Sequence, residues 1–166
     1  MRRFLLFFLL FNGIIAFAET PSIHELRAMY YGAPKDKEIA DRFLRVMDRI
    51  KPDADPILVA YKGMASMLKA NHAINPYTKL SYFSKGKVIL ERAVEVDPNN
   101  IEIRFLRFCA QTNAPFFLGY NSKIQADKMV ILNFWNKLTD DDLKARIRTY
   151  MLASGYCSKN EKAILL

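Results

Sequence analysis

The stretch that decides the fold reads Gly-Lys-Val-Ile-Leu-Glu-Arg-Ala-Val-Glu-Val-Asp-Pro-Asn-Asn, from Gly86 to Asn100. Ala93 is small enough for the backbone of a second helix to approach closely. Pro98 ends a helix because it has no backbone N–H to donate and clashes with the preceding turn. The Asn99 side chain can accept hydrogen bonds from the first free N–H groups of a following helix. The stretch therefore predicts the end of one helix, a turn and the start of the next.

Similar start and stop signals divide the rest of the chain. Ser22 with Glu25 and Asn99 with Glu102 have the spacing of capping boxes, and Asp55 precedes a proline, which the first helical turn tolerates. No alternating apolar pattern of useful length indicates a β-strand. The expected helices are 22–31, 35–50, 55–71, 79–96, 99–112, 121–138 and 139–153. The sequence therefore predicts an all-α protein of about seven helices.

Three of the helix starts recur at a nearly constant interval. Asp55, Asn99 and Thr139 are 44 and 40 residues apart, and each interval holds two helices. Units of this size, each burying one face against the next, are typical of an α-solenoid. We expect antiparallel helix hairpins stacked as a short solenoid, with a compact helical bundle as the alternative.

The stretch from Gly86 to Asn100 also resembles the second helix and closing turn of a tetratricopeptide repeat (TPR). In that family a small residue lies five positions before a proline, as Ala93 does before Pro98. Gly63, in the preceding helix, resembles a small position of the repeat's first helix. The resemblance implies a TPR-like fold with a groove that binds proteins or peptides, and it supplies no reaction.

A second resemblance covers residues 102–107 together with 115–120. These segments are similar to small exported TPR-like proteins of Gram-negative bacteria. This resemblance implies an exported binding protein.

The first eighteen residues have the layout of a secretory signal peptide. Arg2 and Arg3 precede an apolar run that ends in Ala-Phe-Ala, with small residues where signal peptidase needs them. We expect cleavage near Ala18 and a periplasmic or secreted protein, with an uncleaved N-terminal anchor as the alternative. The remainder would be one α-helical domain, 19–157, and a C-terminal tail, 158–166.

The chain is basic, with 25 lysines and arginines, 17 acidic residues and a net charge of +8. Removal of the signal peptide would lower this charge to +6, because the segment contains two arginines and no acid. The basic residues are interleaved with acidic ones, and an exported protein is not expected to meet nucleic acid. The charge leaves a second function open, namely a basic helical domain that associates with membrane-surface or cell-wall polyanions.

Residues that carry catalytic chemistry are scarce. His24 and His72 fall in different helices without the neighbouring ligands of a metal site. No phosphate-binding glycine loop or nucleophile elbow is present in the sequence. Cys109 is expected in the core, and a disulfide between Cys109 and Cys157 stays open. The sequence predicts a non-enzymatic protein that uses no metal and no cofactor.

The helix predicted over 99–112 is apolar around most of its circumference. Arg104, Arg107 and Gln111 form its single polar stripe. In one interpretation the two arginines bind a carboxylate or another anion in a groove. In the other, which we favour, they form a structural network with an acidic residue, and Glu102 and Asp127 are the candidates.

The loop 114–120 carries three aromatic residues, Phe116, Phe117 and Tyr120. Neighbouring aromatic side chains do not easily point inward together, so one of them is a candidate contact for a partner. The alternative is a loop that folds back over the end of the core. The leading hypothesis for function is a non-enzymatic exported helical repeat module that binds a protein or peptide partner.

Overall fold

The computed structural model describes residues 21–166, and the predicted signal peptide lies outside this range. The described residues are all-α and contain no β-strand, as the sequence predicts. Their helices are α1 (Ile23–Gly32), α2 (Lys37–Arg49), α3 (Pro56–His72), α4 (Pro76–Val96), α5 (Ile101–Asn113), α6 (Ile124–Phe134), α7 (Asp141–Ala153) and α8 (Lys159–Ile164), with two short 3-10 turns, η1 (Phe116–Leu118) and η2 (Trp135–Lys137). None of the helices within this range combines the length and apolar character needed to cross a bilayer.

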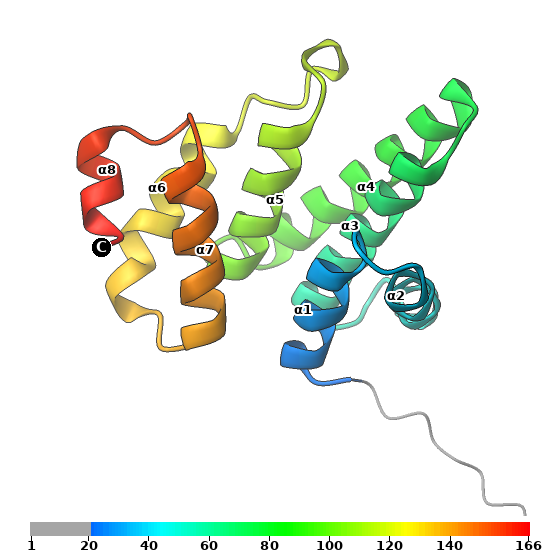
Figure 1. Ribbon diagram of the computed structural model, residues 1–166, viewed down its shortest axis with the longest axis horizontal. Helices are drawn as coiled ribbons and strands as arrows, with labels where there is room; N and C mark the ends of the chain where they lie inside the picture. The colour runs from blue at the N-terminus through cyan, green and yellow to red at the C-terminus, as the bar shows by residue number, and fades with distance from the viewer. Residues whose placement is uncertain (1–20) are drawn as a thin grey trace, which may run out of the picture.

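Consecutive helices pair in space. α1 packs against α2, α3 against α4 and α5 against α6, and α3 also contacts α2 and α5. Figure 1 shows α1 to α4 towards one end of the elongated molecule and α6 to α8 towards the other, with α5 between them.

α5 belongs to two core clusters at once. It contributes Ile103 and Leu106 to the core formed with α1 to α4. It contributes Phe105 and Phe108 to the core formed with α6 and α7. A helix covered on two sides needs apolar residues around most of its circumference, which explains the sequence of α5.

α3 and α4 touch through the small residues singled out in the sequence. A Cβ atom on Gly86 would lie 2.6 Å from the carbonyl oxygen of Gly63, and a Cβ on Gly63 would lie 2.9 Å from the carbonyl oxygen of Gly86. Ala93 is buried about two turns after Gly86 along α4, and Pro98 follows the end of that helix. The two backbones are therefore in direct contact, which side chains at these glycines would prevent.

Two helix starts differ from the sequence prediction by one residue. Asn100, not Asn99, caps α5 by accepting from the N–H groups of Glu102 and Ile103. Asp140, not Thr139, caps α7 by accepting from the N–H group of Leu143. In both places two adjacent residues have capping side chains, and the sequence alone does not choose between them.

α4 starts three residues earlier than the expected helix 79–96. The Asn75 side chain caps it and Pro76 occupies its first turn, so Asn75-Pro76 is a helix start and not a break. This is the arrangement that Asp55 and Pro56 form at α3. A proline is tolerated there because the first N–H groups of a helix have no intrahelical partner.

The segment 158–166, expected as a tail, contains α8 and packs on the core formed with α6 and α7. The Lys128 ammonium group lies 2.8 Å from the carboxylate of Glu161, and it also donates to the carbonyl oxygen of Tyr156. The side chain of Leu165 is fully buried. The hydrogen bonds from Lys128 and the α8 capping box lower the pKa of Glu161 to about 2, so this ion pair persists in mild acid. The prediction of seven helices is therefore one too few.

Candidate functional site

The polar stripe of α5 converges on one buried carboxylate from α6. Arg107 donates through Nε and Nη2 to the two oxygens of Asp127, at 2.9 and 2.7 Å. Arg104 donates through Nη1 to the same carboxylate at 2.9 Å. Gln111 donates to it through Nε2 at 2.8 Å. All three residues of the predicted polar stripe therefore donate to Asp127, which is one of the two acidic partners considered from the sequence.

The donors of this network are already engaged within the protein. The remaining arm of Arg107 contacts Glu91 on α4 at 2.6 Å, and Nε of Arg104 donates to the carbonyl oxygen of Pro98. Burial lowers the pKa of Arg107, but the hydrogen bonds and charges of Asp127 and Glu91 outweigh burial and raise it. An anionic ligand would have to displace an internal carboxylate, so the geometry favours the structural interpretation of the stripe.

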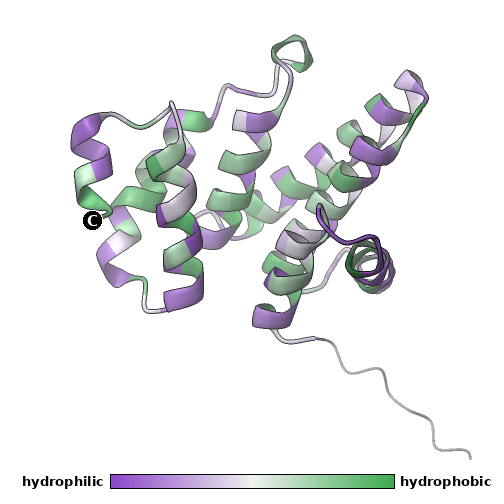
Figure 2. Ribbon diagram, viewed as in Figure 1, coloured by the Kyte–Doolittle hydropathy of each residue, from purple (hydrophilic) through white to green (hydrophobic). Residues whose placement is uncertain are grey.

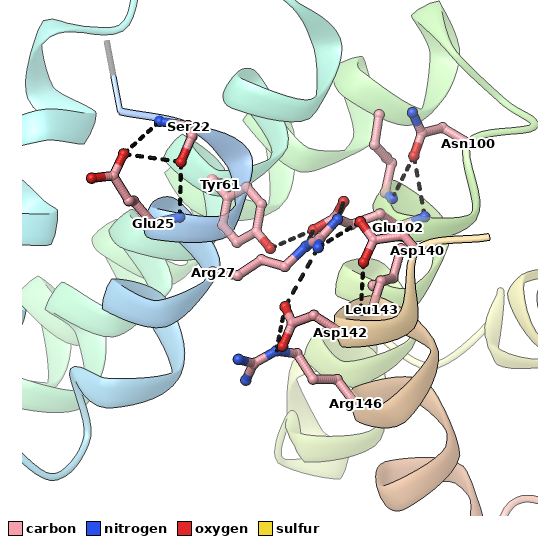
Figure 3. Close-up of polar contacts among 11 residues, drawn as sticks. Ser22, Glu25, Arg27, Tyr61, Asn100, Glu102, Asp140, Asp142, Leu143 and Arg146 are labelled. Carbon is pink, nitrogen blue, oxygen red and sulfur yellow. Dashed lines mark hydrogen bonds and ion pairs between the residues drawn. The ribbon is translucent and has the colours of Figure 1, made fainter. Parts of the chain in front are cut away.

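A second buried network was not expected from the sequence. Arg27 of α1 is almost fully buried and holds Glu102 of α5 through two hydrogen bonds of 2.6 and 2.8 Å. Tyr61 of α3 donates to the same carboxylate at 2.7 Å. Figure 3 shows Asp140, the N-cap of α7, and Asp142, in its first turn, close to the same Arg27 guanidinium. Four helices far apart in sequence therefore meet at one ion-pair network.

This network explains why Glu102 does not pair with Arg104 or Arg107. Burial lowers the pKa of Arg27, but Glu102 and Asp140 more than offset burial and raise it, so the guanidinium stays charged. Burial and the neighbouring Glu102 carboxylate also raise the pKa of Tyr61, which keeps its hydroxyl protonated as a donor. In the sequence, the one hint of this network is the position of Arg27 between the apolar residues Leu26 and Met29, which the structure shows to be buried.

One group of side chains has the composition of a metal site. His24, Asp140 and Asp142 each place one ligand atom within 4.8 Å of the others. Both carboxylates, however, contact Arg27, and Asp142 also accepts two hydrogen bonds from Arg146. The guanidinium charges repel a cation from these oxygens, so the group is better described as an extension of the ion-pair network.

A cleft of about 370 Å³ opens where α1, α3, α4, α5 and α7 approach one another. We call it the aromatic cleft, because three tyrosines and a phenylalanine contribute to its wall. Its lining residues are Tyr30, Tyr31, Pro34, Met64, Met67, Leu68, Asn71, Phe83, Cys109, Ala110, Asn113, Ala114, Pro115 and Tyr150. The sequence did not predict this site, since its walls come from five separate helices.

The three aromatic residues of the loop after α5 lie in two different environments. Phe116 and Phe117 are 87% and 83% exposed, whereas Tyr120 is buried and donates to Glu91 at 2.6 Å. Gly119 turns the chain between them with a φ of 61°, in the left-handed region that favours glycine. The interpretation of the loop as a cover over the core is therefore right for Tyr120 and wrong for the two phenylalanines.

Cys109 and Cys157 are free thiols, and both are buried in the core formed with α6 and α7. Burial raises the pKa of each thiol and so disfavours the reactive thiolate.

A thiol titration tests this arrangement. Because both cysteines are buried, we expect slow reaction with a chromogenic disulfide in the native protein. After denaturation without reductant, we expect two thiols per chain. A count of zero in the denatured, unreduced protein would show that the two cysteines form a disulfide.

No family model, curated protein or solved structure matches this chain. The functional interpretation therefore depends on the chemistry of the described surfaces. Of these, the aromatic cleft combines a mainly apolar lining with side chains that form no internal ion pair.

Proposed function

We propose that this protein is a non-enzymatic helical module of TPR-like hairpins that binds a protein or peptide partner in the aromatic cleft. The observation that carries the proposal is the cleft itself, with its apolar walls and a volume of about 370 Å³. Ligand sites in proteins are mostly concave and apolar, with a few polar groups that fix orientation. The paired packing of successive helices is consistent with stacked hairpins.

The chemistry of the cleft favours a peptide segment with a large apolar side chain. Methionines such as Met64 and Met67 adapt their shape to an inserted group. Tyr30 and Tyr150 offer ring faces and edges for aromatic contacts. The amide side chain of Asn71, exposed at the cleft, can donate to and accept from a peptide backbone.

The described residues give little support to an enzymatic alternative. The Cys109 thiol lines the cleft, but burial raises its pKa and keeps it protonated. His24 is exposed near Asp140 and Asp142, whose carboxylates contact Arg27, and His72 ends α3 on an exposed turn. We therefore propose a binding role without metal or cofactor, in the periplasmic or secreted location that the predicted signal peptide implies.

Filling the cleft tests the proposal. Peptides would be selected from a random displayed library on the wild-type protein, and the affinity of a selected synthetic peptide measured by fluorescence anisotropy. Ala114→Trp places an indole in the cleft from a half-buried position that follows α5. Because the indole would occupy the space of an apolar anchor, we expect a loss of affinity of about ten-fold or more.

Ala163→Trp is the matched control, since Ala163 is exposed on α8. This variant should bind the selected peptide as the wild type does. Equal binding by Ala114→Trp, or the failure of the wild-type protein to enrich any peptide, would refute the proposal.

A further inference from the structure

The end of the α3–α4 hairpin projects from the body of the protein with apolar side chains uncovered. Every residue from Ile74 to Tyr82 is exposed, and we call this segment the α3–α4 tip. Ile74 is 98% and Tyr77 84% exposed, and Leu80 lies one turn after Tyr77 on the same side of the helix. Single exposed apolar residues are common, whereas an uncovered group of this kind marks a contact surface.

A second projection lies close to the first. It is the η1 turn, where Phe116 and Phe117 are both uncovered. Asn71, just before the α3–α4 tip, and Pro115, just before the η1 turn, line the same cleft. Figure 1 shows both projections on one long edge of the molecule, and Figure 2 shows the η1 turn as hydrophobic. The two projections can therefore contact one surface together.

The chain segments that form these projections carry only basic charged side chains, although Asp36 and Asp41 line a hollow beside the α3–α4 tip. Between Asp55 and Glu91 the sequence has no acidic residue and five lysines, so the interleaving of charges expected from the sequence fails in this region. Lys79 and Lys85 on the first half of α4 are exposed, and neither forms an ion pair with the described residues. The η1 turn lies between Glu102 and Asp127, and no acidic residue occurs between these two positions.

We propose that the α3–α4 tip and the η1 turn form a docking surface for an anionic lipid bilayer. Exposed aromatic and aliphatic side chains would enter the headgroup region while lysines contact lipid phosphates, as in peripheral proteins that lie on a membrane without crossing it. Tyrosine suits this depth because its ring is apolar and its hydroxyl stays hydrated. Two separate convex projections also fit a fluid interface better than the complementary surface of a folded protein.

Vesicle flotation tests the proposal with the full chain. We expect the wild-type protein to float with vesicles of phosphatidylglycerol and phosphatidylethanolamine in equal parts, and to stay in solution with phosphatidylcholine vesicles. The tip variant Tyr77→Ser/Phe117→Ser should lose about ten-fold or more in vesicle affinity, because it removes one apolar anchor from each projection. Lys79→Glu/Lys85→Glu should lose at least about five-fold for each lysine.

The matched control is Val96→Ser/Met129→Ser. These residues are also exposed and apolar, but Val96 ends α4 about 30 Å from its start and Met129 lies on α6. The control should bind vesicles as the wild type does, and so should Ala114→Trp, which separates this surface from the aromatic cleft. All the substituted positions except Ala114 are exposed, and unchanged circular dichroism would show that each variant is folded.

Three results would overturn the proposal. The first is failure of the wild-type protein to float with the anionic vesicles at physiological salt. The second is flotation that is lost with the lysines but unchanged in the tip variant, which would indicate binding to any polyanion. The third is a wild-type dimer on gel filtration that the tip variant dissociates, which would assign the projections to a second copy of this chain.

Discussion

Replacing Asp127 by alanine is expected to lower the free energy of unfolding by about 3–5 kcal/mol, because it removes the buried carboxylate shared by Arg104 and Arg107 and leaves Glu91 as the one remaining acidic partner of Arg107 in the network. The Asp127 side chain is fully buried and accepts from Arg104, Arg107 and Gln111. A loss of this size is a large part of the roughly 5–15 kcal/mol that stabilises a typical domain. Urea denaturation followed by far-ultraviolet circular dichroism measures it.

Two further variants serve as comparisons for Asp127→Ala. Asp127→Asn keeps the shape and one acceptor oxygen, so it should be folded and destabilised by less than alanine. Asp48→Ala removes an acid whose ion pair with Lys69 is largely exposed, and it should leave the denaturation midpoint nearly unchanged. If Asp127→Ala were as stable as Asp48→Ala, the polar stripe of α5 would not be structural, and its arginines would be free to bind a ligand.

Gly86→Leu is expected to destabilise the protein by about 3 kcal/mol through overpacking. Its Cβ atom would lie 2.6 Å from the carbonyl oxygen of Gly63 and 2.8 Å from Cγ of Met67, so the two helices must move apart. Leucine favours a helix over glycine by about 1 kcal/mol, which offsets only part of this cost. Thermal or urea unfolding of the variant gives the difference.

The control for this substitution is Gly155→Ala. A Cβ atom at Gly155 would have no neighbour within 4 Å, so its stability should be close to that of the wild type. If Gly86→Leu were also neutral, the close backbone contact of α3 with α4 would not contribute to the fold.

The secondary structure was largely readable from the sequence, because helix ends are marked by local chemistry. Proline and capping side chains act on their own turn, so they place α2, α3 and α5 within a residue or two. The errors arose where the local signal has two readings. Asn75-Pro76 can end a helix or start one, because the asparagine can cap a helix and the proline fits either a break or a first turn.

The candidate sites were less predictable, because their partners are distant in the chain. Asp127, which pairs with Arg107 across 20 residues, was one of two candidate acids, and the sequence did not choose between it and Glu102. The pairing of Arg27 with Glu102 spans 75 residues and depends on how α1 returns to α5, which no local pattern encodes. The aromatic cleft depends on the same long-range packing.

The position of α5 between the two cores has a consequence for cooperativity. Each half of the molecule packs on one side of this helix. On α5, Glu102 pairs with Arg27 of the N-terminal half, and Arg107 pairs with Asp127 of the C-terminal half. Unfolding of either half would strip one side of α5 and expose it to water. The chain should therefore melt as a single unit, and any cut between its hairpins would leave neither fragment with a complete interior.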